Sequence, residues 1–263
     1  MKKATKVTLG VIFLAVLGYL VSFLIPAPVS WSSDLPTFKW TLANSILYTL
    51  LHIGAAVLFM AAVNTYKAGL KKAYAAIASG IVLVGVGLAQ VVFINVFGLL
   101  QTPWVEYGGV MLPFVAAGLA IYFGVRAMAK LVGASSPLTN LWIVLPFLVV
   151  SVIVAELLPH VASPLPELYF DISNAISVWD VVLYGASLGL VLHIKKLSGA
   201  HYTESMAWLA LGLTGSVAIT TYILIGTYST GIQPGGYVLD VAVVLGGLLY
   251  IKAGHSFVKT EEL

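Results

Sequence analysis

The stretch "SILYTLLHIGAAVLFMAAV", residues 45–63, contains no charged residue and is long enough to cross a bilayer as a helix. About 20 apolar residues span a hydrocarbon core of about 30 Å. Similar runs recur at about 7–25, 41–65, 73–99, 105–126, 139–158, 172–194, 205–228 and 235–256. The runs are continuous and do not alternate with polar residues, which favours α-helices over a membrane β-barrel. The sequence therefore predicts an all-α polytopic membrane protein with eight transmembrane helices.

Composition agrees with this fold class. The chain is 60% hydrophobic and only 9% charged, with a mean hydropathy of +1.02. Ordinary soluble domains are roughly 25% charged. The net charge of +3 comes from basic residues scattered over short segments, which does not predict a nucleic-acid-binding surface. The absence of cysteine excludes disulfides, iron–sulfur ligation and thiol chemistry in this chain.

The distribution of basic residues predicts the orientation. Lys and Arg in short loops stay on the cytoplasmic side of a membrane. With eight spans and the N-terminus inside, twelve of the 13 basic residues fall on the inner side, and only Lys39 falls outside. We therefore expect both termini to be cytoplasmic and the protein to lie in the cell membrane as a multi-pass protein. The first run also resembles a signal peptide, but its length and the lack of a clean cleavage site favour a retained helix.

Two predicted outer loops resemble each other. One reads "SSDLPTFKWTLANSI" (32–46) and the other "ASPLPELYFDISNAI" (162–176), and at an offset of 130 five residues are identical. Further along, "YGGVML" (107–112) aligns with "PGGYVL" (234–239) at an offset of 127. Shared hydropathy alone does not predict matched prolines, asparagines and glycine pairs. The pattern favours two tandem, parallel four-helix repeats, residues 1–132 and 133–263, related by an axis along the membrane normal.

Polar residues inside the spans gather in the outer half. His52 shares a helix face with Asn44 and Tyr48, while Asp180 and Tyr184 lie on a similar stripe. An ionised carboxylate in a membrane requires a partner, a water-filled cavity or a proton. We predict a ligand-binding or proton-linked site, and its candidate residues are Asp180, Asp240, His52, Tyr184 and Tyr237.

A structural role remains open for several of these polar residues. Asn44 and Asn174 suit helix caps or interhelical hydrogen bonds, and His52 suits a core histidine bonded to a neighbour. At the loop offsets Asp180 aligns with Leu50 and Asp240 with Pro113, so that any site would be asymmetric. The glycine-rich stretches 80–87, 211–216 and 245–247 predict faces where helices pack closely.

Sequence motifs narrow the functional classes. Of the histidines, only His52 lies deep in a span, which disfavours a haem held by two histidines of this chain. Glu156 and His160 supply too few ligands to predict a metal site, and no "HExxH" or "GxSxG" motif supports a stand-alone catalyst. The partners expected are membrane lipid and other membrane-protein subunits.

Three functions remain open. The leading hypothesis is an integral subunit of a respiratory or redox complex, with a quinone-type site near the outer face; quinone is the cofactor that this hypothesis implies. The first alternative is a transporter of a small solute or ion, which internal repeats and membrane-embedded aspartates favour. The second is a structural or assembly subunit that has no site of its own.

Overall fold

The structure is a computed structural model that describes residues 3–26, 35–63, 68–97, 112–157, 167–197, 200–230 and 237–261. Within these ranges, the side chains of residues 91–97, 154–157, 167–174, 200–201, 225–230, 237–238 and a few other residues near helix ends lie outside the description. The described chain is α-helical apart from short connections and contains no β-strand.

Eight helices are described, and seven of them are long and apolar enough to cross a membrane. Their bounds are α1 Lys3–Ser22, α2 Leu35–Val63, α3 Ala68–Phe97, α5 Leu112–Leu131, α6 Pro137–Leu157, α7 Glu167–Leu197, α8 Ala200–Thr230 and α9 Tyr237–Glu261. In α6 the described apolar stretch, Leu138–Ile153, is shorter than in the others. The prediction of an all-helical chain with several long apolar helices, typical of a multi-pass membrane protein, is confirmed.

The helix predicted at 105–126 is described as α5 from Leu112 to Leu131, which extends past the predicted end. Residues 105–111 lie outside the described residues. Pro113 is the second residue of α5, and proline is tolerated in a first helical turn, where the backbone N–H has no intrahelical partner. At the other end α5 continues past Arg126 to Lys130, because a basic side chain in the last turn interacts favourably with the helix dipole.

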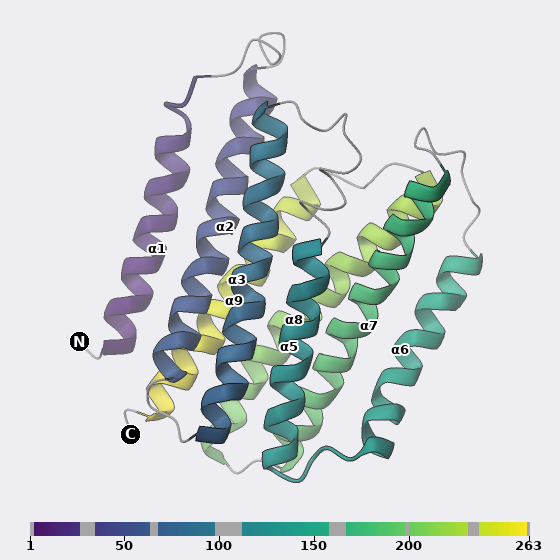
Figure 1. Cartoon of the computed structure of the whole chain (residues 1–263). Coiled ribbons are helices and arrows are strands. Elements are labelled where there is room, and N and C mark those ends of the chain that lie inside the picture. The colour runs from purple at the N-terminus through teal and green to yellow at the C-terminus, as the bar shows by residue number, and fades with distance from the viewer. Residues whose placement is uncertain are drawn as a thin grey trace.

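Six helices form a closed ring (Figure 1). Neighbours around it are α2 and α3, α3 and α5, α5 and α7, α7 and α8, α8 and α9, and finally α9 and α2. Helices α1 and α6 lie outside the ring, where α1 packs mainly on α2 and α6 mainly on α7. Both outer helices expose large apolar side chains, such as Phe13 and Trp142, as expected for lipid-facing helices.

The start of α1 and the end of α9 lie at the same end of the bundle, which we call the terminus end (Figure 1). Thr8 Oγ1 and His255 Nδ1 are 2.9 Å apart and form a hydrogen bond between these helices. Since each helix reverses direction relative to the one before it, α2, α5, α7 and α9 all begin at the opposite end.

Glycines bring ring helices into close contact, as the glycine-rich stretches predict. A Cβ on Gly80 of α3 would lie 2.8 Å from the carbonyl oxygen of Ala117 on α5, and one on Gly124 would lie 2.7 Å from that of Ala73. In hydrocarbon, such close backbone packing drives helix association. Gly215 and Gly246 are exceptions, because a Cβ at either position would meet nothing within 4 Å.

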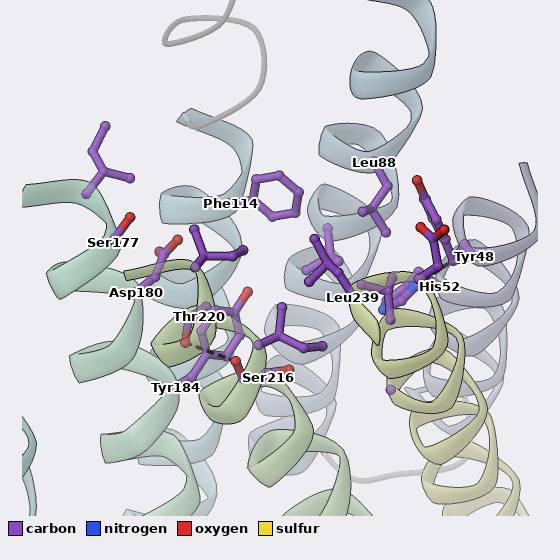
Figure 2. A pocket seen from close by; sticks show the side chains of 17 residues that line it. Tyr48, His52, Leu88, Phe114, Ser177, Asp180, Tyr184, Ser216, Thr220 and Leu239 are labelled. Carbon is purple, nitrogen blue, oxygen red and sulfur yellow. Dashed lines mark hydrogen bonds between the residues drawn. The ribbon is translucent and has the colours of Figure 1, made fainter. Parts of the chain in front are cut away.

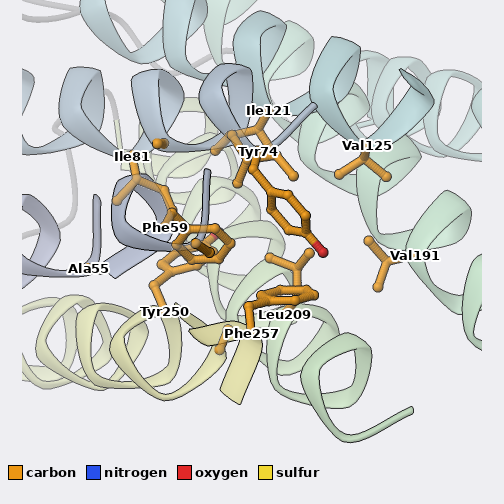
Figure 3. Packing of buried hydrophobic residues seen from close by; sticks show 14 of the residues in the cluster. Ala55, Phe59, Tyr74, Ile81, Ile121, Val125, Val191, Leu209, Tyr250 and Phe257 are labelled. Atoms are coloured by element: carbon orange, nitrogen blue, oxygen red, sulfur yellow. The ribbon is translucent and has the colours of Figure 1, made fainter. Parts of the chain in front are cut away.

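An aromatic cluster fills the ring near the terminus end (Figure 3). The Phe257 ring of α9 lies between those of Tyr74 and Phe59, with centroids 4.9 Å and 5.6 Å away. These three rings are almost completely buried, as are Leu209 and Ile121 around them. The ring of helices therefore has a dense core at this end, and what remains unfilled lies nearer the opposite end.

Candidate functional site

A cavity of about 250 Å³ lies inside the ring, towards the end opposite the termini (Figure 2). All six ring helices contribute to it. Its lining consists of Tyr48 and His52 from α2, Val84 and Leu88 from α3, Phe114 from α5, Ile176, Ser177, Asp180 and Tyr184 from α7, Ser216, Ile219, Thr220 and Ile223 from α8, and Leu239, Asp240, Val243 and Gly246 from α9.

Asp180 is the most unusual residue of this cavity. Its side chain is only 7% exposed, and its Oδ1 atom has no hydrogen-bond partner. Figure 2 shows the carboxyl group beside Ser177 and above Tyr184, on the α7 side of the cavity. Asp180 lies within the described apolar span of α7, Ala175–Leu197. An unpaired polar atom within such a span is costly, and a hydrogen-bond donor would lower this cost.

Asp240 lies in the same cavity but has a partner. Asn44 Nδ2 on α2 donates a hydrogen bond to Asp240 Oδ2 on α9, at 3.1 Å. The role of Asn44 as an interhelical hydrogen-bond donor, one of the two expected from sequence, is thereby confirmed. The two aspartates thus differ, since Asp240 accepts from a side-chain amide, whereas Asp180 Oδ1 has no partner among the described residues.

His52 is held in one tautomer by its own helix. Its Nδ1 lies 2.7 Å from the backbone oxygen of Tyr48, and because a carbonyl only accepts, Nδ1 carries the proton and donates. Nε2 of the neutral ring is therefore an acceptor. On the other side of the ring, α9 approaches so closely that a Cβ on Gly247 would lie 3.3 Å from two ring atoms. This packing limits the freedom of a side chain that is 4% exposed.

Most hydroxyl groups around the cavity already form hydrogen bonds within the protein. Tyr48 Oη and Ser45 Oγ are 2.5 Å apart, and Thr220 Oγ1 donates to the Ser216 backbone oxygen at 2.9 Å. Ser216 Oγ and Tyr250 Oη are 2.8 Å apart. Tyr250 links the cavity to the aromatic cluster, because its ring also lies 6.2 Å from that of His52.

Four of the five residues that the sequence singled out line this one cavity: His52, Asp180, Tyr184 and Asp240. The side chain of the fifth, Tyr237, lies outside the described residues, as do those of Asn174, Glu156 and His160. Sequence reasoning missed the apolar walls, including Val84, Leu88 and Phe114, because an apolar residue in an apolar run carries no distinguishing signal.

The lining of the cavity is of the kind found in small-molecule pockets. No group of three or more metal-ligating side chains occurs among the residues that the structure describes. The cavity is somewhat smaller than the roughly 300–1,000 Å³ of drug-binding pockets, and its mostly apolar wall carries a few convergent polar groups. Comparison with protein-family models, curated proteins and solved structures finds no match for this chain.

Proposed function

We propose that this chain is a small-solute transporter of the cell membrane, with its solute site in the cavity between two tandem four-helix repeats, residues 1–132 and 133–263. The observation that carries the proposal is a cavity lined by helices of both halves of the chain and containing a buried, unpartnered carboxylate, Asp180. Secondary transporters bind their substrates at the interface between structural repeats, near the bilayer midplane.

The pattern of helix contacts supports the duplication. Each contact in the first half has a counterpart in the second: α1 with α2 corresponds to α6 with α7, α2 with α3 to α7 with α8, and α3 with α5 to α8 with α9. The two contacts that close the ring, α2 with α9 and α5 with α7, also exchange under this correspondence. A two-fold axis along the membrane normal, through the cavity, accounts for these contacts, whereas the smaller contacts of α1 with α9 and of α6 with α8 have no counterpart of similar size among the described helices.

Close packing supports a sequence offset of 132 between the second and third helices of one repeat and those of the other. Gly80 of α3 packs against Ile121 of α5, and Gly212 of α8, at this offset from Gly80, packs against Tyr250 of α9. For the fourth helices, α5 and α9, the corresponding offset is 129. A Cβ on Gly118 of α5 would lie 3.1 Å from Leu183, and a Cβ at the equivalent Gly247 of α9 would lie 2.9 Å from Leu51. Leu51 and Leu183 are themselves separated by the offset of 132.

This register replaces the loop offset of 130 inside the helices. At 130, Asp180 would correspond to Leu50, yet a Cβ on Gly18 would lie 2.5 Å from Leu50, which places this leucine against α1 and away from the cavity. At 132, Asp180 corresponds to Tyr48 and Tyr184 to His52, and all four are buried and line the cavity. Both repeats then contribute equivalent positions to one site.

The aromatic cluster would be the closed gate of such a transporter. Phe257 lies eleven residues beyond the cavity residue Gly246 on α9, about 16 Å along the helix. Its contacts with Phe59 and Tyr74 join the second half of the chain to the first (Figure 3). Alternating access between two halves requires contacts of this kind to separate while those at the opposite end close.

The positive-inside pattern supports a cytoplasmic terminus end, so that the cavity faces outwards. The sequence has no cysteine, which makes a single introduced thiol an unambiguous reporter. Ser136 is exposed in the connection between α5 and α6, at the terminus end. A membrane-impermeant maleimide should label Ser136→Cys in inverted vesicles and leave it unlabelled in intact cells. Labelling in intact cells would reverse the orientation.

Transport can be measured before the solute is identified. Proteoliposomes containing the full chain are incubated with a mixed pool of amines, amino acids, sugars and carboxylates, and their contents are measured by mass spectrometry. We expect at least one solute to accumulate above protein-free liposomes, and its uptake to fall at least about tenfold in Asp180→Asn. The matched control is Glu204→Gln, which removes an exposed carboxylate from α8 outside the cavity.

Uptake of every solute at the level of protein-free liposomes would count against transport. Uptake that Asp180→Asn leaves unchanged would place the solute pathway elsewhere in the protein.

The second candidate function is the quinol-linked subunit of a redox complex, and the His52 tautomer favours it. Nε2 of His52 and the Asp180 carboxylate are acceptors on different sides of the cavity (Figure 2). Such a pair complements the two O–H groups of a hydroquinone. Oxidation of the hydroquinone would transfer two protons to these acceptors and two electrons to a redox partner subunit. Quinone in the lipid extract of the purified protein, lost in His52→Leu, together with co-purifying redox subunits, would support this function over transport.

A further inference from the structure

The carboxyl group of Asp180 defines what a ligand of this cavity must provide. Its side chain is more than nine-tenths buried, Oδ1 lacks a partner, and Figure 2 shows the group facing the cavity. Gly118 of α5 lies beside this carboxyl group and has no side chain that could donate to it, since a Cβ there would lie 3.7 Å from Asp180 Oδ1. Oδ1 has no hydrogen-bond partner in the described part of the chain, and Asp180 lines the cavity, so a bound molecule is the source from which the carboxyl group can still gain a donor.

The charge of the lining points to a cation. Among the described residues that line the cavity there are two carboxylates and neither a lysine nor an arginine. Asp240 accepts from Asn44, whereas no described residue donates to Asp180 Oδ1. Because burying an unpaired carboxylate is costly, a single positive charge next to Asp180 supplies the largest interaction still available.

The walls opposite Asp180 suit an apolar group. Phe114, Val84, Leu88 and Val243 line the cavity together with two isoleucines of α8. Gly87 on α3 provides the space for the Phe114 ring, since a Cβ at Gly87 would lie 3.0 Å from two ring atoms. An inorganic cation would require several oxygen ligands around it, which these walls do not provide. An ammonium group carrying a small hydrocarbon body matches both parts of the cavity.

We infer that the cavity binds a small monovalent organic cation, a primary alkyl- or arylammonium. Its N–H groups donate to Asp180, and its apolar body lies against Phe114 and the aliphatic side chains of α3 and α8. This inference rests on the proposed function for its biological meaning, because it names the class of solute that the transporter would carry. The binding itself is measurable without transport.

The test uses the full chain purified in detergent and three probes of similar shape: 2-phenylethylammonium, neutral 2-phenylethanol and anionic phenylacetate. Calorimetric titration measures their dissociation constants, and sodium and potassium chloride serve as inorganic probes. We expect the ammonium compound to bind at least about tenfold more tightly than the alcohol, and phenylacetate to bind most weakly, because one charge-assisted hydrogen bond contributes about this factor.

Variants assign the binding to Asp180. Asp180→Asn keeps the shape of the side chain, and we expect it to weaken ammonium binding by about 10- to 100-fold while leaving the alcohol unchanged. Phe114→Ala should weaken both compounds together. Glu204→Gln should change neither, and a monodisperse elution profile with an unchanged thermal transition identifies the variants that fold.

Equal affinity for the ammonium compound and the alcohol in the wild type would overturn the inference, as would tight ammonium binding retained in folded Asp180→Asn. Sodium or potassium that displaces the ammonium probe at equal concentration would also overturn it, in favour of an inorganic cation site. Selective ammonium binding without uptake into proteoliposomes would leave the cation site standing and remove the proposed transport function. Uptake of a neutral solute that does not depend on Asp180 would support transport and remove the proposed cation site.

Discussion

Asn44 and Asp240 form a hydrogen bond across the contact that closes the helix ring, with Asn44 Nδ2 3.1 Å from Asp240 Oδ2. Helix α2 is the second of the described helices in the chain and α9 the last, so the bond joins segments 196 residues apart. Interhelical hydrogen bonds in membranes contribute on average about 0.6 kcal/mol and at most about 1.7 kcal/mol. This bond therefore orients Asp240 in the lining of the cavity more than it stabilises the whole bundle.

Removing the Asn44 side chain should show that Asn44 and Asp240 are energetically coupled. We expect Asn44→Ala to lower the free energy of unfolding by about 1 kcal/mol, because Asp240 loses the amide group that donates a hydrogen bond to it. In a double-mutant cycle with Asp240→Asn, measured by reversible unfolding in mixed micelles, the coupling energy should be about 0.5–1.5 kcal/mol. The matched control is Asn140→Ala on α6, whose effect should add to that of Asp240→Asn. Zero coupling between Asn44 and Asp240 would contradict the bond.

Replacing Asp180 by a leucine should stabilise the empty protein. Asp180 Oδ1 is buried without a partner, and an apolar side chain of similar size removes that cost and extends into the cavity. We expect Asp180→Leu to raise the free energy of unfolding by about 1–3 kcal/mol and to abolish binding of the ammonium probe. Tryptophan fluorescence during unfolding measures the first effect. A less stable Asp180→Leu would show that the carboxylate has a partner in the folded protein.

The attachment of α6 should depend on Gly185. A Cβ on Gly185 of α7 would overlap the ring of Phe147 on α6, and α6 has few other neighbours. We expect Gly185→Ala to cost about 1–3 kcal/mol, because the aromatic ring must move away from α7. Gly215→Ala on α8 is the matched control, since a Cβ there meets nothing within 4 Å and should gain about 0.5–1 kcal/mol from helix propensity. Similar effects of the two variants in unfolding experiments would argue against this packing.

The aromatic cluster should account for much of the stability of the terminus end. Phe257 is fully buried between Tyr74 and Phe59, so Phe257→Ala leaves a void and should cost about 3–5 kcal/mol. Phe123→Ala, at a phenylalanine of α5 that is 54% exposed, should change stability by less than about 0.5 kcal/mol. If Phe257 is also the gate, its alanine variant should leak solute from loaded proteoliposomes. A Phe257→Ala protein that does not leak solute would show that the aromatic cluster has a structural role only.

The sequence was sufficient for the helical class and for most polar residues of the site. Hydropathy locates helices because every backbone polar group in lipid must be satisfied internally, and a charged or imidazole side chain is conspicuous in such a run. His52 and Asp180 were visible for this reason. The ends of α5 and α9 were less accurate, because hydropathy does not register that a helix accepts basic residues in its last turn.

The shape of the site could not be predicted from the sequence. Val84 and Phe114 are indistinguishable by type from residues that face lipid, and only the ring arrangement brings them to the cavity. The register that we propose for the two repeats was also not evident from the sequence. Matched loop motifs suggest an offset of 130, whereas glycine contacts such as those of Gly80 and Gly212 lie inside the helices and support 132. Which aspartate lacks a partner depends on a contact between α2 and α9 that no local pattern contains.

The closure of the ring by α9 has a consequence for biosynthesis. Helices leave the ribosome in chain order, so the contact between α2 and α9 cannot form until the other described helices have been made. During that interval one wall of the cavity is missing, and Asp180 on α7 is left beside an incomplete bundle. Substitutions that delay insertion of α9 should therefore reduce the amount of protein that escapes membrane proteolysis, even where the affinity of the finished site is unchanged.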